Sequence, residues 1–235
     1  MQNGTSLEKH DNEQLIEIPA GTAKLEAILV LPETARGVIL FAHGSASGRL
    51  SPRNLYLARA LHERGFGTLL MDLLMIDEAE DQQKRLDTDL LAERVLLATD
   101  WIEENSGLAN LRVGYFGADT GAAAVLVAAA RAGIQDGIPI TGEPGPCAVV
   151  CRSGRTDLAG PYLPYVKAPT LLIVGSNDEE ARTVNTRAYE GLRCQKELTV
   201  IAGASHQFEE AGALDQAAQL AGTWFSRYLE RAKNC

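Results

Sequence analysis

The sequence contains few cysteines and no long apolar run. Its four cysteines are too few for a disulfide scaffold in 235 residues, and none forms a C-x-x-C pair, so we interpret them as small apolar residues rather than metal ligands. No stretch approaches the roughly 20 consecutive apolar residues that a membrane-spanning helix needs. Residues 1–13 lack the apolar core of a secretory signal and are expected to be a flexible extension. These absences predict a protein of the reducing cytoplasm.

Basic residues are also in the minority. Lys and Arg number 22 against 31 Asp and Glu, a formal net charge of −9. Phosphate backbones and anionic headgroups repel such a protein, so we expect a small-molecule substrate and neither nucleic acid nor a membrane as partner. The hydrophobic share of 46% suits a chain that folds into one globular domain, and the sequence leaves a homodimer open.

Short apolar runs alternate with longer helical patterns along the chain, which predicts an α/β fold with a mostly parallel sheet. The expected strands are 14–18, 24–31, 38–42, 67–72, 111–116, 148–151, 170–175 and 198–201. The expected helices are 52–64, 86–104, 122–132, 179–192 and 213–232. The glycine- and proline-rich segment 133–146 is expected to be a loop, and the acidic segment 77–81 a solvated loop or helix entry.

One junction between a predicted strand and a predicted helix contains a candidate catalytic residue. The strand 111–116 runs into the segment G-A-D-T-G (117–121) and then an alanine-rich helix. Glycines two residues before and after a polar residue allow a sharp turn that holds its side chain at the carboxyl edge of the sheet, facing backbone N–H groups of the helix. Asp119 is therefore either a nucleophile on a strained turn or an ordinary helix N-cap.

Two polar residues follow later strands in the same way. Asp178 comes just after the strand 170–175, and His206 follows the strand 198–201. Because the carboxyl ends of parallel strands share one edge of a sheet, we expect Asp119, Asp178 and His206 to converge there.

The chain resembles the α/β-hydrolases, and among them the small, capless dienelactone-hydrolase-like proteins. The motifs that carry the resemblance are F-A-H-G-S (41–45), the turn 117–121, A-P-T-L-L-I-V-G (168–175) before Asp178, and G-A-S-H (203–206). The resemblance implies an α/β-hydrolase fold: a single, mostly parallel, twisted sheet of about eight strands flanked by helices, with no separate cap domain. It also implies an enzyme that needs neither a cofactor nor a metal.

The residue at the centre of the turn departs from the family pattern, which has Ser or Cys where this chain has Asp119. A carboxylate that attacks an acyl carbon would form an anhydride, so it is a poor nucleophile for ester hydrolysis. It is suited to displacement at a saturated carbon, which gives an alkyl ester that water then cleaves. In this respect Asp119 resembles the nucleophile of epoxide hydrolases and haloalkane dehalogenases.

Two sequence features help to separate those two activities. Haloalkane dehalogenases usually have a tryptophan beside the nucleophile, whereas this chain has Thr120, and both of its tryptophans fall on expected helices. Epoxide opening needs a proton donor, commonly a pair of tyrosines. Tyr162 and Tyr165 lie in an expected loop after the strand 148–151, where they either overhang the site or are ordinary surface aromatics.

The resemblance also implies a role for each candidate residue. Asp119 would be the nucleophile, His206 the general base for the hydrolytic water, and Asp178 the partner that orients the imidazole. Backbone N–H groups of Ser45 and Thr120 would form the oxyanion hole.

Four further residues are candidates for a supporting role. His43 follows a strand and is expected to shape the oxyanion loop. Asp157 is an alternative acid to Asp178, unless it pairs with Arg155 or caps a short helix. Arg152 and Arg155 either bind an anionic group of the substrate or form structural ion pairs.

Three functional hypotheses follow. The first is a cofactor-independent hydrolase that forms a covalent ester at Asp119 with an epoxide or another activated alkyl substrate. The second is the family's ester or lactone hydrolysis, with Asp119 standing where Ser is usual. The third is a catalytically silent binding protein, against which the presence of both Asp178 and His206 argues.

Overall fold

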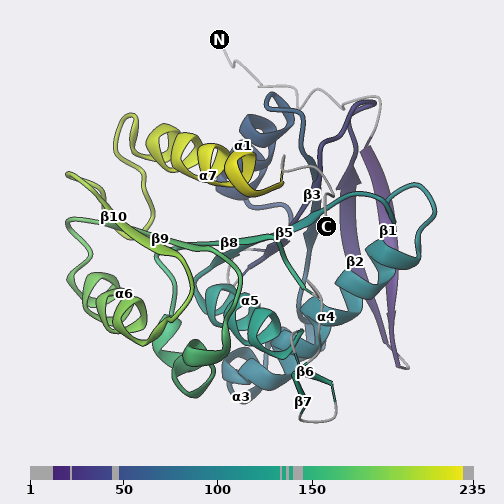
Figure 1. Cartoon of the computed structure of the whole chain (residues 1–235), viewed down its shortest axis with the longest axis horizontal. Helices are drawn as coiled ribbons and strands as arrows, with labels where there is room; N and C mark the ends of the chain where they lie inside the picture. Colours follow the sequence, from purple (N-terminus) through teal and green to yellow (C-terminus); the bar gives the residue numbers. More distant parts are fainter. Residues whose placement is uncertain are drawn as a thin grey trace.

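The chain forms one eight-stranded sheet and a small two-stranded one. The structure is a computed structural model, and it describes residues 13–21, 23–43, 48–132 and 145–229, together with the backbone of two short strands, β6 and β7. The strands of the large sheet are β1 (Glu13–Ala20), β2 (Ala23–Val30), β3 (Val38–Ala42), β4 (Gly67–Met71), β5 (Val113–Ala118), β8 (Ala148–Arg152), β9 (Thr170–Gly175) and β10 (Lys196–Ile201). Their spatial order is β1-β2-β4-β3-β5-β8-β9-β10 (Figure 1).

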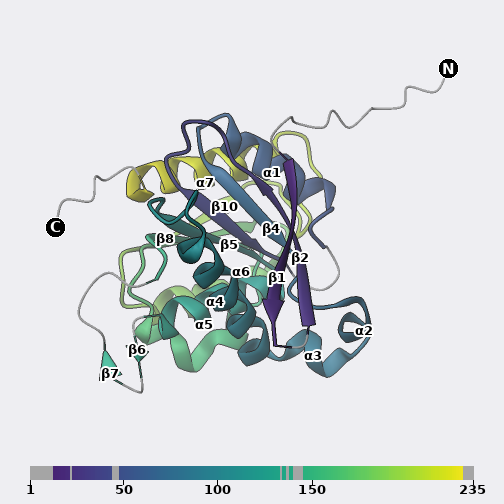
Figure 2. The ribbon, with the colours of Figure 1, turned by 90° about the vertical axis from the view of Figure 1, so that its right-hand side faces the viewer.

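The pairing in this sheet changes from antiparallel to parallel across its width. β1 pairs with β2, and β2 with β4, in antiparallel register, and Figure 2 views the sheet from the side of this hairpin. Every neighbouring pair from β4 to β10 is parallel. The carboxyl ends of the parallel strands therefore lie at one edge, which is where ligands bind in open α/β sheets.

Helices cover both faces of the large sheet. They are α1 (Pro52–His62), α2 (Ile76–Ala79), α3 (Gln82–Leu86), α4 (Thr88–Glu104), α5 (Thr120–Arg131), α6 (Glu179–Gly191) and α7 (Ala213–Leu229), with a 3-10 segment η1 (Thr156–Tyr165). α1 and α7 lie on one face, and α4, α5 and α6 on the other (Figure 1). Leu40 and Phe41, adjacent in β3, point to opposite faces and join separate buried clusters, one with Val125 of α5 and one with Phe225 of α7.

The predicted α/β-hydrolase architecture is confirmed, with two local differences on the segment after β4. The acidic segment 77–81 overlaps α2 and ends at Asp81, the N-cap of α3, so the helix-entry alternative is confirmed; its Glu78, however, is buried instead of solvated, because Arg94 pairs with it. The predicted helix 86–104 corresponds to α4 and begins two residues later than predicted, because the Asp87 carboxylate accepts a hydrogen bond from the Leu90 N–H at 3.0 Å and so caps α4.

Two predicted segments lie largely outside the described residues. Within the segment 133–146, where the sequence predicts a loop, the described backbone forms the antiparallel pair β6 (Ile134–Gln135) and β7 (Ile138–Pro139). Of the predicted extension 1–13, only Glu13 is described, and it begins β1. In the described part of the chain, no helix has the length and apolar character needed to cross a membrane.

Candidate active site

The turn between β5 and α5 has the strained backbone of a nucleophile elbow. Asp119 has φ of 53° and ψ of −127°, a conformation that costs a residue with a β-carbon about 1–3 kcal/mol. A β-carbon on Gly121 would lie 2.2 Å from the Ala42 carbonyl oxygen, and one on Gly117 would lie 2.6 Å from Cα of Ala122. Both glycines are therefore required for β3, β5 and α5 to pass so closely, as the sequence predicts.

The Asp119 carboxylate does not cap α5. The residue takes the N-cap position and is half-buried, yet its side chain accepts no hydrogen bond from the first helical turn. Asp178 stands at the same position of α6 and does cap it, since its Oδ1 accepts from the Ala181 N–H at 3.1 Å. The N-cap alternative for Asp119 is thus wrong. The Asp119 carboxylate lies at the N-terminus of α5 but accepts no hydrogen bond from the N–H groups of its first turn.

The loop after β10 brings His206 against Asp178. His206 Nδ1 lies 2.6 Å from Asp178 Oδ2, and the two side chains are 45% and 10% exposed. When Nδ1 donates to the carboxylate, Nε2 of the neutral imidazole is left as the basic nitrogen. The two loops pack tightly here, because a β-carbon on Gly175 would lie 2.2 Å from the Ala204 carbonyl oxygen.

The His206 loop also folds back toward the elbow. β8 and β9 separate β5 from β10, a gap of about 14 Å at ordinary strand spacing, so a loop after β10 must cross the sheet edge to reach the elbow. Phe208, with φ of 57°, places its ring 5.3 Å from the guanidinium carbon of Arg152 at the end of β8. The Arg155 N–H donates to the Asp119 carbonyl at 3.0 Å. These contacts connect the loops after β5, β8 and β10.

Asp157, the alternative acid, is engaged elsewhere. Arg155 Nε and Nη2 donate to its two carboxylate oxygens at 3.0 and 2.8 Å. These hydrogen bonds and the Arg155 charge lower the pKa of Asp157 below its ordinary value. His206 contacts Asp178, so Asp157 as the acid is wrong, because a guanidinium two residues away satisfies its carboxylate. For Arg155 the same contacts favour the structural ion pair.

The Tyr162 hydroxyl lies at the far end of α5 from the elbow. It donates to Asp89 at 3.0 Å and accepts from Arg131 Nη2 at 2.9 Å. Arg131 ends the helix that Thr120 begins, about 16 Å away. Tyr162 as a proton donor at the site is therefore wrong, because η1 runs along α5 instead of overhanging the elbow. Tyr165 is 59% exposed at the end of η1.

Of the two predicted oxyanion donors, only Thr120 lies within the described residues, and Ser45 lies outside them. Thr120 opens α5, so its backbone N–H has no partner within the helix. Its hydroxyl is buried without a hydrogen-bond partner. The oxyanion role of both residues stays a prediction.

His43 is buried and neutral at the end of β3. Burial, with a smaller effect from the charge of Arg152, lowers the pKa of His43 to about 3. Both of its ring nitrogens lack a hydrogen-bond partner. Since Gly121 packs on the Ala42 carbonyl and on the backbone nitrogen of His43, the backbone at His43 borders the elbow.

Arg152 is buried with part of its guanidinium unpartnered. It is 6% exposed, and Nε and Nη1 have no hydrogen-bond partner. Burial lowers the pKa of Arg152 to about 10; the charge of Arg53 acts in the same direction and that of Asp119 opposes it. The sequence does not distinguish Arg152 from Arg155, and it gives no sign that Arg53 lies nearby. The only sequence signal for Phe208 is that it follows His206 by two residues.

Metal ligands do not gather at this edge of the sheet in the described ranges. There, no group of three or more His, Cys, Asp or Glu side chains is placed to hold a metal ion.

Comparison with known proteins identifies the family. A crystal structure of a dienelactone hydrolase from Anabaena variabilis is 47% identical to this chain, and the match covers 92% of this chain and 97% of that one with a TM-score of 0.81. The chain belongs to the dienelactone-hydrolase-like family of α/β-hydrolases. Est1E from Butyrivibrio proteoclasticus shares the α/β-hydrolase fold at 16% identity, with a TM-score of 0.70 over 92% of this chain and 99% of that one. No protein-family model matches.

Two curated proteins of Mycobacterium tuberculosis are also similar to this α/β-hydrolase. Each is 44% identical over 216 residues, which is 91% of this chain, and each carries the name "putative phosphoribosyl transferase". The match covers 46% of those proteins, so the chain spans about half the length of the curated relatives it matches. Fold and family together place the chain among proteins of the α/β-hydrolase fold.

Proposed function

We propose that this α/β-hydrolase works through a covalent ester at Asp119. The observation that carries the proposal is the backbone of Asp119, which is held at φ of 53° between β5 and α5 without any capping bond from its side chain. A strained residue whose side chain does not serve its own helix is typical of a catalytic position. The His206–Asp178 contact of 2.6 Å at the same sheet edge supplies the base that such chemistry needs.

In the first step, a carboxylate oxygen of Asp119 attacks a saturated carbon of the substrate. The new carbon–oxygen bond forms as the bond to the leaving group breaks, and the leaving group keeps the electron pair. An epoxide oxygen would need a proton, and the Tyr162 hydroxyl, one of the two tyrosine candidates to give one, is bound to Asp89 and Arg131. The site therefore favours a leaving group that departs as a stable anion.

An activated or strained cyclic ester fits this requirement. Attack at its alkyl carbon opens the ring and releases a carboxylate, which needs no proton at neutral pH. The similar structure is named a dienelactone hydrolase, and a lactone is likewise a cyclic ester, but the proposed step requires a lactone whose ring oxygen is bonded to a saturated carbon. Epoxides are the second class of substrate to be examined.

In the second step, water cleaves the ester. His206 Nε2 takes a proton from the water, whose oxygen attacks the carboxyl carbon of Asp119, and Asp178 stabilises the imidazolium. The resulting oxyanion faces the N-terminus of α5, where Thr120 supplies a backbone N–H. The bond from the Asp119 carboxyl carbon to the alkoxy oxygen then breaks, and the departing alkoxide takes the proton from His206. The Asp119 carboxyl group releases the second proton of the water to solvent, which restores the carboxylate.

The second candidate function is acyl hydrolysis of an ester or lactone. The 47% identity with a dienelactone hydrolase favours it. Because an anhydride at Asp119 is a poor intermediate, the His206–Asp178 pair would activate water for direct attack on the substrate carbonyl. The two candidates differ in which substrate bond breaks and in whether Asp119 exchanges an oxygen atom.

Oxygen-18 water separates the two candidates. In a single turnover with a panel of lactones, aryl esters, epoxides and alkyl halides, the proposal predicts that Asp119 itself gains one oxygen-18, read by mass spectrometry of its peptide. Direct acyl hydrolysis instead labels the carboxylate of the product and leaves Asp119 unlabelled. Label in the product carboxylate would overturn the proposal in favour of the second candidate.

A trapping experiment supplies the matched controls. His206→Ala should accumulate an adduct at Asp119, and the double variant Asp119→Asn/His206→Ala should accumulate none. We expect Asp119→Asn alone to lose activity by about 1000-fold or more. If acyl hydrolysis is the native reaction, Asp119→Ser should hydrolyse aryl esters faster than the parent chain. Neither turnover nor an adduct with any member of the panel would favour a binding protein.

A further inference from the structure

The two edges of the large sheet differ in how their sequences discourage pairing with another strand. β1 and β10 form the opposite edges (Figure 1). Natural proteins protect a free edge with charged residues and with proline, which has no N–H to donate. β1 carries Glu13, Glu17 and Pro19, and Glu17 forms an exposed ion pair with Lys24 at 2.6 Å. β10 has the sequence K-E-L-T-V-I, without a proline.

The one basic residue of β10 gives its edge little protection. Lys196 Nζ donates to the carbonyl groups of Tyr189 and Leu192 at 2.6 and 2.7 Å and lies 4.6 Å from the centre of the Tyr189 ring. These contacts hold the ammonium group against the end of α6 instead of leaving it free at the edge. Val200 lies on the same face of the strand and is 48% exposed. The outer side of β10 is therefore apolar and weakly guarded.

The backbone of β10 has hydrogen-bonding groups available on its outer side. The Thr170 N–H donates to the Gln195 carbonyl and the Ser176 N–H to the Ile201 carbonyl, both at 2.9 Å. With the parallel register between the two strands, these bonds show that the odd-numbered residues 195–201 face β9. The even-numbered residues, Lys196 and Val200 among them, turn N–H and C=O outward, where no described strand pairs with them.

A groove beside this edge extends the exposed surface. It lies between β10 and α7 and has a volume of about 430 Å³. Leu220 and Trp224 contribute apolar surface to it, and Glu197 and Arg227 contribute one charge of each sign. A surface that carries both signs is able to face a copy of itself, because each charge can meet its opposite.

We propose that β10 is the interface of a homodimer, in which two copies of this chain pair their edge strands in antiparallel register about a two-fold axis at Leu198. This register joins every outward N–H and C=O of the strand, because Leu198 meets its own copy and Lys196 meets Val200 of the second copy. On the other face Glu197 lies opposite Thr199, a residue whose hydroxyl already donates to Glu197 at 3.3 Å within one strand.

The proposed register is self-complementary. It places no like charges directly opposite one another, and like charges there would be destabilising. It also joins the two large sheets into one continuous sheet. The interface is independent of the chemistry proposed at Asp119, since it uses the outer side of the last strand.

Amide hydrogen exchange of the unaltered full chain tests the register residue by residue. The protein is compared at about 1 µM and about 1 mM, a range that spans weak and moderate affinities. We expect exchange at the N–H groups of Lys196, Leu198 and Val200 to slow by about tenfold at the higher concentration. The N–H groups of Glu197 and Thr199 already bind β9 and should not change. Sedimentation velocity should show the mass rising from that of one chain to that of two.

Two substitutions of Val200 test which residues meet across the axis. Val200→Lys places a lysine opposite Lys196 of the second copy, and the axis makes this contact twice, so we expect the dissociation constant to rise by about tenfold. Val200→Glu places a carboxylate opposite the same lysine and should leave the constant unchanged or lower it. Overall charge predicts the reverse order, because each copy has a formal net charge of −9 that lysine reduces and glutamate increases.

The matched control is Leu15→Lys on β1, where Leu15 is 68% exposed. It should dimerise as the parent chain does. A chain that stays monomeric at about 1 mM overturns the proposal, and so does a dimer that Leu15→Lys weakens and Val200→Lys does not. A dimer that Val200→Glu weakens more than Val200→Lys overturns the register. The exchange measurement on the unaltered chain decides the matter without any variant, since slowing confined to another segment also overturns the proposal.

Discussion

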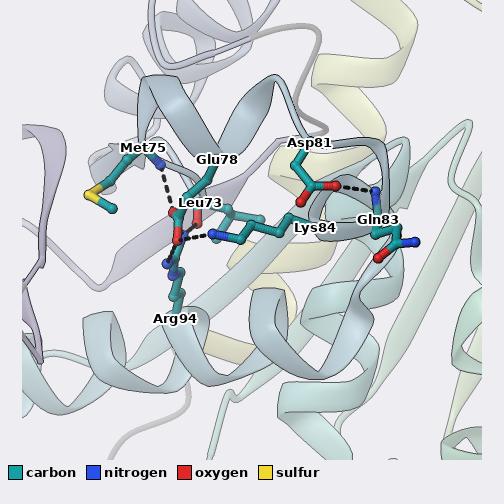
Figure 3. A network of polar contacts seen from close by, with 7 residues as sticks. All are labelled: Leu73, Met75, Glu78, Asp81, Gln83, Lys84 and Arg94. Atoms are coloured by element: carbon teal, nitrogen blue, oxygen red, sulfur yellow. Dashed lines mark hydrogen bonds and ion pairs between the residues drawn. The ribbon is translucent and has the colours of Figure 1, made fainter.

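Two arginines of this chain are equally buried, at 6% exposure each, and differ in what surrounds them. Arg94 of α4 donates from Nη1 to the Leu73 carbonyl and to Glu78 Oε2, both at 2.6 Å, and from Nη2 to Glu78 Oε1 at 2.8 Å (Figure 3). Arg152 leaves Nε and Nη1 without a partner. The comparison shows that a buried charged side chain is a candidate for function only when no other group of the chain pairs with it.

The Arg94 cluster shows what a satisfied charge does for the fold. Hydrogen bonds from Arg94 lower the pKa of Glu78 to about 2, and the Glu78 carboxylate also accepts from the Met75 N–H at 3.1 Å. Lys84 adds a contact at 3.4 Å. The network fastens α2 and α3 onto α4 (Figure 3). The Glu78 carboxylate and both terminal nitrogens of Arg94 are paired within the chain, so this buried pair serves the fold.

Removing the guanidinium of Arg94 should have the largest effect on stability. Arg94→Met leaves the Glu78 carboxylate buried without its main cation, so we expect a loss of about 3–5 kcal/mol in the free energy of unfolding. Urea denaturation followed by circular dichroism measures it. The double variant Arg94→Met/Glu78→Leu should recover most of the loss, because it removes both charges. No recovery would show that the pair matters through its packing.

Acidification should destabilise the protein through His43, which borders Arg152. Its pKa is about 3 in the folded chain against an ordinary 6.5, so between these values the unfolded state binds a proton that the folded state does not. Stability is therefore lost as the pH falls below 6.5, by about 1.4 kcal/mol per unit, or about 2 kcal/mol by pH 5. Glu78 has a pKa of about 2 in the folded chain and an ordinary pKa of 4.5. Its protonation therefore lowers the stability further only below pH 4.5.

Urea denaturation at several pH values checks this sign and slope. His43→Gln should flatten the curve between pH 6.5 and 5, whatever its effect on stability at pH 7. An unchanged slope in that variant would mean that His43 accepts a proton in the folded protein.

Removing the guanidinium of Arg152 should have the smallest effect on stability. Arg152→Met replaces an unsatisfied buried cation by an apolar side chain of similar length, so we expect a change within about 1 kcal/mol, of either sign. Urea denaturation alongside Arg94→Met gives the direct comparison. A loss as large as that of Arg94→Met would show that Arg152 serves the fold.

Most of the fold is predictable from local sequence. The bounds of β3 and β9 agree with the predicted strands, because a buried strand is a short apolar run between turn residues. The elbow is predictable as well, since Gly117 and Gly121 stand where a β-carbon would meet backbone at 2.6 and 2.2 Å. A turn whose close packing requires glycine can therefore be recognised from the sequence alone.

Side-chain partners across the sheet edge are not predictable in this way. Asp157 and Asp178 are both acids placed after strands, and only the folded loops decide that Asp178 meets His206 while Arg155 takes Asp157. Tyr162 likewise turns to Arg131 instead of the elbow, because η1 packs along α5.

The sequence by itself determined the order of strands and helices, the sharp turn at Asp119 and the placing of acid and imidazole after later strands. These follow from apolar periodicity and from glycines that a turn cannot do without. Only the tertiary structure decided that Arg94 is satisfied and Arg152 is not. The reason is physical: a buried donor is filled or left open by groups that are distant along the chain, and packing alone brings them near or keeps them away.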